Sequence, residues 1–522
     1  MAGRMTQRRN TPDTSPLNNA NMILAQLRPF APLASLTAVG LVLAGCAIGP
    51  NYVRPSVTTP TAFKEAAGWT QAAPGDLSDR GDWWTLFNDP VLNDLEAKVV
   101  VNNQNLIAAQ AAYRESIALL DQQRASLFPS VNATGSATQS KSAASTFAST
   151  TGTVLPSGVS TVNRPIKNYS LKLGASWDVD VWGNIRRAVE SARDTAQASK
   201  ADLANAKLSA QILLAVDYVQ LRATDEQKRL IDDTVKAYAD NLRIVNNKFN
   251  SGVAARSDVL TAQTQLKSAQ ASAVDLLRTR AQYEHAIAVT IGEAPADLTL
   301  QLKPWTLKEP PVPVGVPSTL LERRPDIAAA ERSMAAANAQ IGVAMGGYFP
   351  QLTLTGSDGF SAATLSRFFS AANNSWSFGA SEVQTIFDAG LTSAKVRAAR
   401  ATYDQQVANY RQTVLTAFQG VEDNIAAIRV LDAEYALDAE ASNEADEAEK
   451  ITNNQYTAGT IDYTSVVVAQ NTALSARRTL IQTDQSRMVA VVDLISALGG
   501  GWNDADLTQV KASPLLPNIL IP

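Results

Sequence analysis

One cysteine and one histidine are the side chains here best suited to metal binding or nucleophilic catalysis. His285 stands between Glu284 and Ala286 in a helical pattern, with no cluster of further ligands beside it. A lone cysteine allows neither an intrachain disulfide nor a cysteine-rich metal site. The sequence also offers no nucleophile with a base and an orienting group. We therefore expect no enzyme activity and no catalytic, metal or cofactor site.

Cys46 has another chemistry available, namely lipid attachment. It follows an apolar stretch from Ala31 to Gly45, which four arginines precede and which closes with the small residues Ala44 and Gly45. This is the arrangement of a secretory signal peptide with its cleavage site, and it resembles the bacterial lipobox. We expect residues 1–45 to be a signal peptide and Cys46 to become the lipidated first residue of the mature chain.

The overall composition excludes some partners. With 45 basic and 49 acidic side chains in 522 residues, the net charge is −4, and this balance argues against nucleic acid, which usually needs a concentrated basic surface. Outside the N-terminus no apolar run reaches the roughly 20 residues of a membrane-spanning helix. A part that spans a membrane would therefore have to be built in another way.

Long helices must position whatever the chain presents to its surroundings. Apolar residues recur in steps of four and three from Ile231 to Phe249 and from Val396 to Val421, which is typical of helices packed in coiled-coil fashion. Residues 184–250 contain no glycine and no proline. One helix there would be about 100 Å long at 1.5 Å per residue, and it would need lateral partners along its whole length.

Four short segments alternate apolar and polar residues, which predicts strands with one apolar and one polar face. They are Val131–Gly135, Tyr169–Trp177, Leu352–Gly356 and Trp376–Ala380. Four strands cannot close a barrel across a bilayer, because known barrels begin at about eight. Either the strands sit on a soluble core, or several chains pool their strands.

The chain also repeats itself. Leu127–Ser136 is similar to Tyr348–Ser357, and Asn246–Gly252 is similar to Asn453–Gly459. Each half is predicted to run helix, strand, loop, strand, long helix, turn, helix, with the Ser/Thr-rich residues 138–165 as the longer loop of the first half. An internal two-fold repeat of this kind usually sets the architecture.

Several motifs carry a resemblance to a known family. They are Gly49–Pro55, Trp83–Pro90, Leu321–Ile327 with its continuation to Pro350, and Ala497–Trp502. Along nearly the whole mature chain the sequence resembles the TolC-like outer-membrane efflux factors, in their NodT-type lipoprotein branch, which serve RND-type tripartite efflux systems.

The resemblance implies an α+β fold and a trimeric channel. Three copies would pool four strands each into a twelve-stranded transmembrane β-barrel, with apolar positions toward lipid and polar positions lining a wet lumen. The long helices would continue it as a hollow periplasmic α-barrel. The expected divisions are as follows: signal peptide 1–45, lipid anchor and extended arm 46–82, first repeat 83–302, crossover linker 303–317, second repeat 318–502, and C-terminal tail 503–522.

The function implied is that of a passive conduit for small molecules in the cell outer membrane, extending into the periplasm. Its partners would be two further copies, outer-membrane lipid, a periplasmic adaptor protein and an inner-membrane RND-type pump that supplies the energy. The alternative is a periplasmic coiled-coil lipoprotein that scaffolds the cell envelope. The alternating segments separate the two, because a scaffold has no use for paired strands with an apolar outer face.

In the family, the turns at the far ends of the long helices form the gate and the adaptor contact. The positions that match are Gly252, Val253, Asp258, Val259, Leu260, Gly459 and Thr460. Acidic residues that narrow the pore in many relatives are replaced here by Ser465 and Val468. Asp462 or Tyr463 could narrow the pore instead; the alternative is that Asp258 and Asp462 only cap helices.

Overall fold

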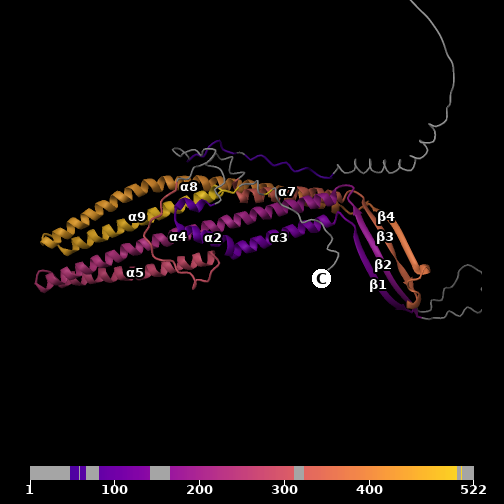
Figure 1. Cartoon of the computed structure of the whole chain (residues 1–522). Coiled ribbons are helices and arrows are strands. Elements are labelled where there is room, and N and C mark those ends of the chain that lie inside the picture. Colours follow the sequence, from indigo (N-terminus) through magenta and orange to yellow (C-terminus); the bar gives the residue numbers. More distant parts are fainter. Residues whose placement is uncertain are drawn as a thin grey trace, which may run out of the picture.

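The computed structural model describes residues 47–57, 59–65, 82–141, 165–310, 323–502 and residue 507. In this part of the chain, long helices run side by side, and a four-stranded sheet lies at one end of them (Figure 1). The expected signal peptide and Cys46 fall outside the described residues, as do residues 311–317 of the crossover linker and most of the C-terminal tail.

Two very long helices run through most of the helical part of the molecule. The predicted 67-residue helix is confirmed as α4, Asn184–Asn250, and its counterpart α8, Leu391–Ala458, has 68 residues. Each turns back into a 35-residue helix, α5 (Arg256–Thr290) after α4 and α9 (Tyr463–Ala497) after α8. The shorter helices are η1 (Trp83–Phe87), α2 (Pro90–Asn102), α3 (Gln104–Ala125) and α7 (Pro325–Gly346).

The sheet is antiparallel throughout, in the order β1-β2-β3-β4. Its strands are β1 (Ser130–Ser140), β2 (Ile166–Val179), β3 (Gln351–Ala362) and β4 (Asn374–Val383). All four extend beyond the alternating segments, and residues 138–140, predicted to be loop, continue β1 instead. Among the described residues, β1 and β4 each pair on one side only.

The element order α3, β1, β2, α4, α5 recurs as α7, β3, β4, α8, α9. The second series also contains two short 3₁₀ turns between β3 and β4, η3 (Leu365–Arg367) and η4 (Ala371–Asn373). Among the described helices, none combines the length and the hydropathy that crossing a membrane would require.

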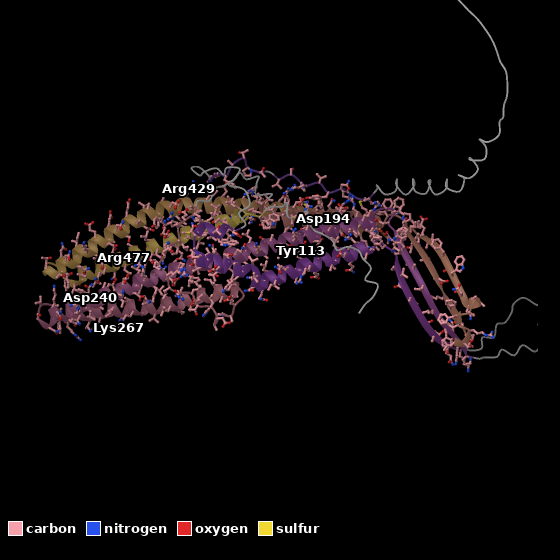
Figure 2. All side chains as sticks on the ribbon, viewed as in Figure 1. Tyr113, Asp194, Asp240, Lys267, Arg429 and Arg477 are labelled. Carbon is pink, nitrogen blue, oxygen red and sulfur yellow. The ribbon has the colours of Figure 1, made fainter. Side chains whose placement is uncertain are left out.

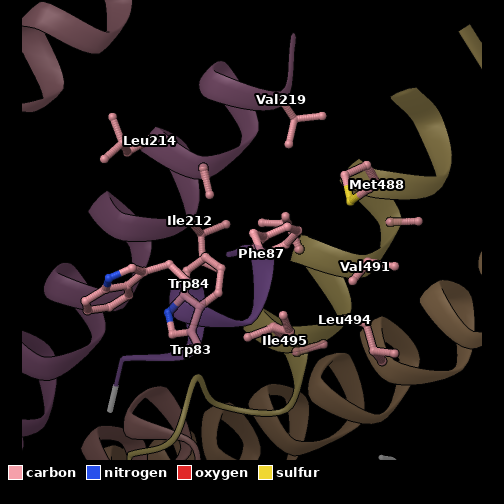
Figure 3. Packing of buried hydrophobic residues seen from close by; sticks show 14 of the residues in the cluster. Trp83, Trp84, Phe87, Ile212, Leu214, Val219, Met488, Val491, Leu494 and Ile495 are labelled. Atoms are coloured by element: carbon pink, nitrogen blue, oxygen red, sulfur yellow. The ribbon is translucent and has the colours of Figure 1, made fainter. Parts of the chain in front are cut away.

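The main hydrophobic core lies where η1 meets α4 and α9 (Figure 3). Trp83, Trp84 and Phe87 are all buried, and the rings of Trp83 and Trp84 meet edge to face at 5.9 Å. They pack with apolar side chains of α4 and of α9. Those labelled in Figure 3 are Ile212, Leu214, Val219, Met488, Val491, Leu494 and Ile495. One short aromatic segment therefore joins helices from both halves of the chain.

Candidate functional site

The sheet has two chemically different faces, because its register is continuous and residues alternate between faces along each strand. Leu171 of β2 stands opposite Gly135 of β1 and Phe360 of β3. The apolar face carries Val131, Ala133, Tyr169, Leu171, Leu173, Ala175, Trp177, Leu352, Leu354, Phe360, Trp376, Phe378 and Ala380. Lys167, Asp358 and Glu382 are the charged residues on this face within the described strands.

The opposite face consists mainly of hydroxyl and amide side chains. Hydroxyl pairs link neighbouring strands there, Ser136 with Ser170 at 2.8 Å and Ser357 with Ser377 at 2.9 Å. Thr353 donates to the Asp178 carboxylate at 2.7 Å. These hydroxyl and carboxylate groups hydrogen-bond to one another and are also exposed to solvent. This face is therefore suited to contact with water.

The apolar face is exposed in the single chain. Leu173 keeps 56%, Phe378 74% and Trp376 77% of its surface accessible. A soluble surface rarely carries contiguous apolar area of this kind. Contact with lipid would account for it.

Aromatic rings gather at both ends of the sheet. At the end away from the helices, Phe369 meets Phe360 at 5.4 Å and Phe368 at 4.9 Å between ring centroids. At the helix end, Trp182 and Phe349 lie 5.1 Å apart. Two aromatic belts around an apolar band are typical of transmembrane barrels.

The two predicted turns lie together at the end of the helices opposite the sheet (Figure 1). Gly252 and Gly459 have φ of +76° and +79°, a left-handed backbone that glycine adopts without a Cβ clash. Beyond them, Val253 and Thr460 donate their amides to the carbonyls of Lys248 and Gln455 at 2.9 and 3.0 Å. Both helices thus end in a glycine cap of the Schellman type.

The two hairpins hold each other at this tip. The Tyr463 hydroxyl of α9 lies 3.2 Å from the Gln265 side-chain oxygen of α5, and Lys248 of α4 donates its ammonium to the carbonyl of Tyr456 in α8. That ammonium also lies 3.9 Å from the centre of the Tyr456 ring, close enough for a cation–π contact. The tip cluster consists of Val245, Val259, Ala262, Tyr456, Tyr463 and Val466.

Two of the predicted site residues are buried in the single chain. Val259 is 0% and Tyr463 3% exposed, because each side chain packs in the tip cluster. Neither side chain is accessible in this arrangement, and burial raises the pKa of Tyr463 to about 12. The exposed members of the predicted set are Gly252, Val253, Leu260, Gly459, Thr460 and Asp462.

The two acids at the tip cap helices, as the alternative interpretation held. Asp462 accepts from the backbone amide and the hydroxyl of Ser465 at 2.9 and 2.8 Å. These hydrogen bonds hold the pKa of Asp462 below its ordinary value. Asp258 accepts from the amide of Ala255 at 3.3 Å. Asp462 is exposed, so its charge also faces solvent at the tip.

Ion pairs between α8 and α9 give the acidic stretch 432–450 a structural role. Arg477 of α9, labelled in Figure 2, donates to Asp446 at 2.7 Å and to Glu449 at 2.9 Å. This surface is partly exposed, but its charges also tie the second hairpin together.

A buried ionic cluster escaped the sequence analysis. Asp225 of α4 accepts from Arg222 of the same helix and from Arg280 of α5, each at 2.8 Å. Arg222 also donates to the carbonyl of Gln301 at 2.9 Å. Asp225 and Arg280 are 55 residues apart, so the spacing of residues along one helix could not have predicted this ion pair. Within the described residues, no group of three or more His, Cys, Asp or Glu side chains could hold a metal ion.

Comparisons with known proteins agree with this geometry. The sequence profile described as "Outer membrane efflux protein" matches residues 97–293 and 316–500. The probable efflux pump outer membrane protein TtgC of Pseudomonas putida is 31% identical over 479 residues, which cover 90% of this chain and 96% of that protein. The pyoverdine export outer membrane protein OpmQ of Pseudomonas aeruginosa is 31% identical over 471 residues, with the same coverage.

A solved structure of the outer-membrane channel OprN superposes with a TM-score of 0.79 at 30% identity, covering 88% of this chain and all of that one. None of these relatives favours the envelope-scaffold alternative, because each is named as an efflux, export or channel protein. The chain therefore belongs to the outer membrane efflux protein family, and it is a TolC-like export channel of the outer membrane that extends into the periplasm.

Proposed function

We propose that three copies of this chain form one passive channel, in which a twelve-stranded barrel crosses the outer membrane and the helices continue it into the periplasm. The observation that carries this proposal is the four-stranded sheet with one apolar face, one polar face and two edges that pair with nothing in the described chain. Barrel closure would give those edges partners, as a bilayer demands. The recurrent element order supports an internal two-fold repeat.

The two faces would then divide between lipid and water. The exposed apolar face of Leu173, Trp376 and Phe378 would contact the hydrocarbon, and the hydroxyl-rich face would line the lumen. Aromatic belts at both ends of the sheet would lie at the two membrane interfaces.

The helical tip would be the gate and the contact for a periplasmic adaptor, which links the channel to an inner-membrane pump of the RND type. Its accessible residues are Gly252, Val253, Leu260, Gly459 and Thr460, with Asp258 partly covered. Val259 and Tyr463 would instead hold the two hairpins in register. Asp462 would be the residue that borders a constriction, since it is exposed and charged.

The remaining expectations also stand as proposals. Cys46 would be lipidated after removal of residues 1–45, and residues 46–82 would form the anchor and arm. The two repeats would span 83–302 and 318–502, joined by a crossover at 303–317 and followed by a tail at 503–522. We propose small molecules as cargo; OpmQ is named for pyoverdine and another relative, CusC of Escherichia coli, for cations.

Thiol labelling in a planar bilayer tests the channel directly. Ser176 of the polar face pairs with Thr355, and its neighbour Ala175 lies on the apolar face. Single variants Ser176→Cys and Ala175→Cys, each with lipidated Cys46 as the other cysteine, would be exposed to a charged, water-soluble thiol reagent.

We expect conductance to fall after labelling of Ser176→Cys and to stay constant for Ala175→Cys. Absence of any conductance from the purified full chain, or an equal response of both variants, would contradict the proposed channel.

A further inference from the structure

Lys172 of β2 is distinctive among the residues of the polar face. Within the described strands, that face carries two charged residues, Lys172 and Asp178. They are six residues apart, about 20 Å along a strand. Asp178 lies near the helix end and accepts a hydrogen bond from Thr353. The rest of the face carries hydroxyl, amide and glycine residues, with Ile166 and Val383 at the strand ends, so no acid lies near Lys172 there.

The neighbouring strand is shaped to receive this lysine. Gly359 of β3 stands directly opposite Lys172. A Cβ on Gly359 would clash first with the carbonyl oxygen of Leu171, and it would also approach Lys172 Cα to 2.7 Å and Lys172 Cγ to 2.8 Å. The glycine therefore lets the aliphatic part of the lysine lie against β3, while the residue itself remains exposed. No ion pair joins Lys172 to another described residue, which leaves its charge uncompensated.

We propose that Lys172 is a selectivity-determining residue of the channel, which favours anionic solutes near the middle of the barrel's length. The inference rests on the proposed trimer, in which three lysine ammonium groups would share one lumen. Ring-like sets of charged side chains set ion preference in pores generally. Because the nearest acid of the same face is far along the strand, the local field at this level would be positive.

The test compares two lysines of the same strand. Lys172 lies on the polar face and Lys167 on the apolar face, so Lys172→Gln and Lys167→Gln remove the same charge from opposite sides of the wall. Reversal potentials would be measured for the purified full chain in planar bilayers under a potassium chloride gradient.

We expect Lys172→Gln to lower the chloride-over-potassium permeability ratio by about twofold near 0.1 M salt, where the Debye length is about 10 Å. Lys172→Glu should lower the ratio further, Lys167→Gln should leave it unchanged, and the effect should shrink in 1 M salt.

An unchanged ratio in Lys172→Gln, or an equal change in both variants, would overturn the inference while conductance itself still supported the channel. Loss of conductance already in the unaltered chain would instead overturn the proposed function, and the inference with it.

Discussion

Two buried acids in the helical body are accommodated in opposite ways. Asp225 accepts hydrogen bonds from two arginines, whereas both oxygens of Glu96 are buried without a hydrogen-bond partner. Burial raises the pKa of Glu96 to about 9, and the positive charge of Lys207 offsets this only in part. At neutral pH the Glu96 carboxyl is therefore protonated and uncharged.

Glu96→Gln should make stability less dependent on pH. A glutamate in the unfolded chain titrates near 4.3, so the native state holds a proton that the unfolded state lacks between about 4.3 and about 9. The free energy of unfolding then falls as pH rises through this window. Melting temperatures from pH 5 to 9 should fall less for Glu96→Gln than for the unaltered protein. The exposed Glu115→Gln in α3 serves as the control and should follow the unaltered protein.

Asp225→Ala should destabilise the protein by about 3–5 kcal/mol, because it leaves Arg222 buried without an acid and leaves Arg280 with Glu284 alone. Urea unfolding followed by the helical circular dichroism signal would measure the loss. Asp233→Ala is the matched control: its partner Lys236 is 76% exposed at the side chain, and exposed pairs contribute at most about 1 kcal/mol. Equal losses in the free energy of unfolding for the two variants would show that the buried ion pairs stabilise the protein no more than an exposed pair does.

At the scale of elements, the strands give a test of which face meets lipid. Leu171→Arg or Leu173→Arg should cost about 2–4 kcal/mol if the residue lies near the bilayer midplane. Ser170→Arg and Ser176→Arg, on the polar face, should assemble normally and change the conductance. The assembled fraction in outer-membrane preparations would measure the difference. Equal damage on both faces would mean that the alternation does not separate lipid from water.

The tip gives a second test. Gly459→Val should abolish export while the protein still inserts, because a branched residue at φ +79° strains the turn by about 1–2 kcal/mol. A Cβ at Gly459 would meet no atom within 4 Å, so the effect belongs to the backbone and to the partner surface. Ala458→Val, exposed in the last turn of α8, controls for the added bulk. Normal drug resistance in cells carrying Gly459→Val would refute the tip assignment.

The sequence predicts these elements unevenly. The length of α4 follows from 67 residues without a helix breaker. The far end of β1, Ala137-Thr138-Gln139-Ser140, has loop-like composition, and only its pairing with β2 makes it a strand. The repeat locates the tip, yet it cannot show that Tyr463 is buried. That burial comes from packing against Val245 and Val259 of the other hairpin, where Gln265, 198 residues away, also contacts the Tyr463 hydroxyl.

At the scale of the whole molecule, the described helices and strands form an open layer with two free sides, and they do not close into a barrel on their own. In the half of the helical body nearer the sheet, α3 packs on α4, α4 on α7, and α7 on α8. In the half nearer the tip, α5 packs on α4, α4 contacts α9, and α9 packs on α8. The helices α3 and α5 therefore border one side and α8 the other, in line with the sheet edges β1 and β4. A cyclic assembly would join these two sides.

The purified protein should accordingly be a trimer in detergent. Each open strand edge would leave backbone groups without partners in the bilayer, at several kcal/mol per group, and pairing β4 of one copy with β1 of the next would remove both edges. Light scattering corrected for bound detergent should give three times the protomer mass, and heating should convert the sample to monomers with loss of strand signal. A stable monomer that keeps its native strand content would rule out shared closure, because four strands alone cannot form a barrel.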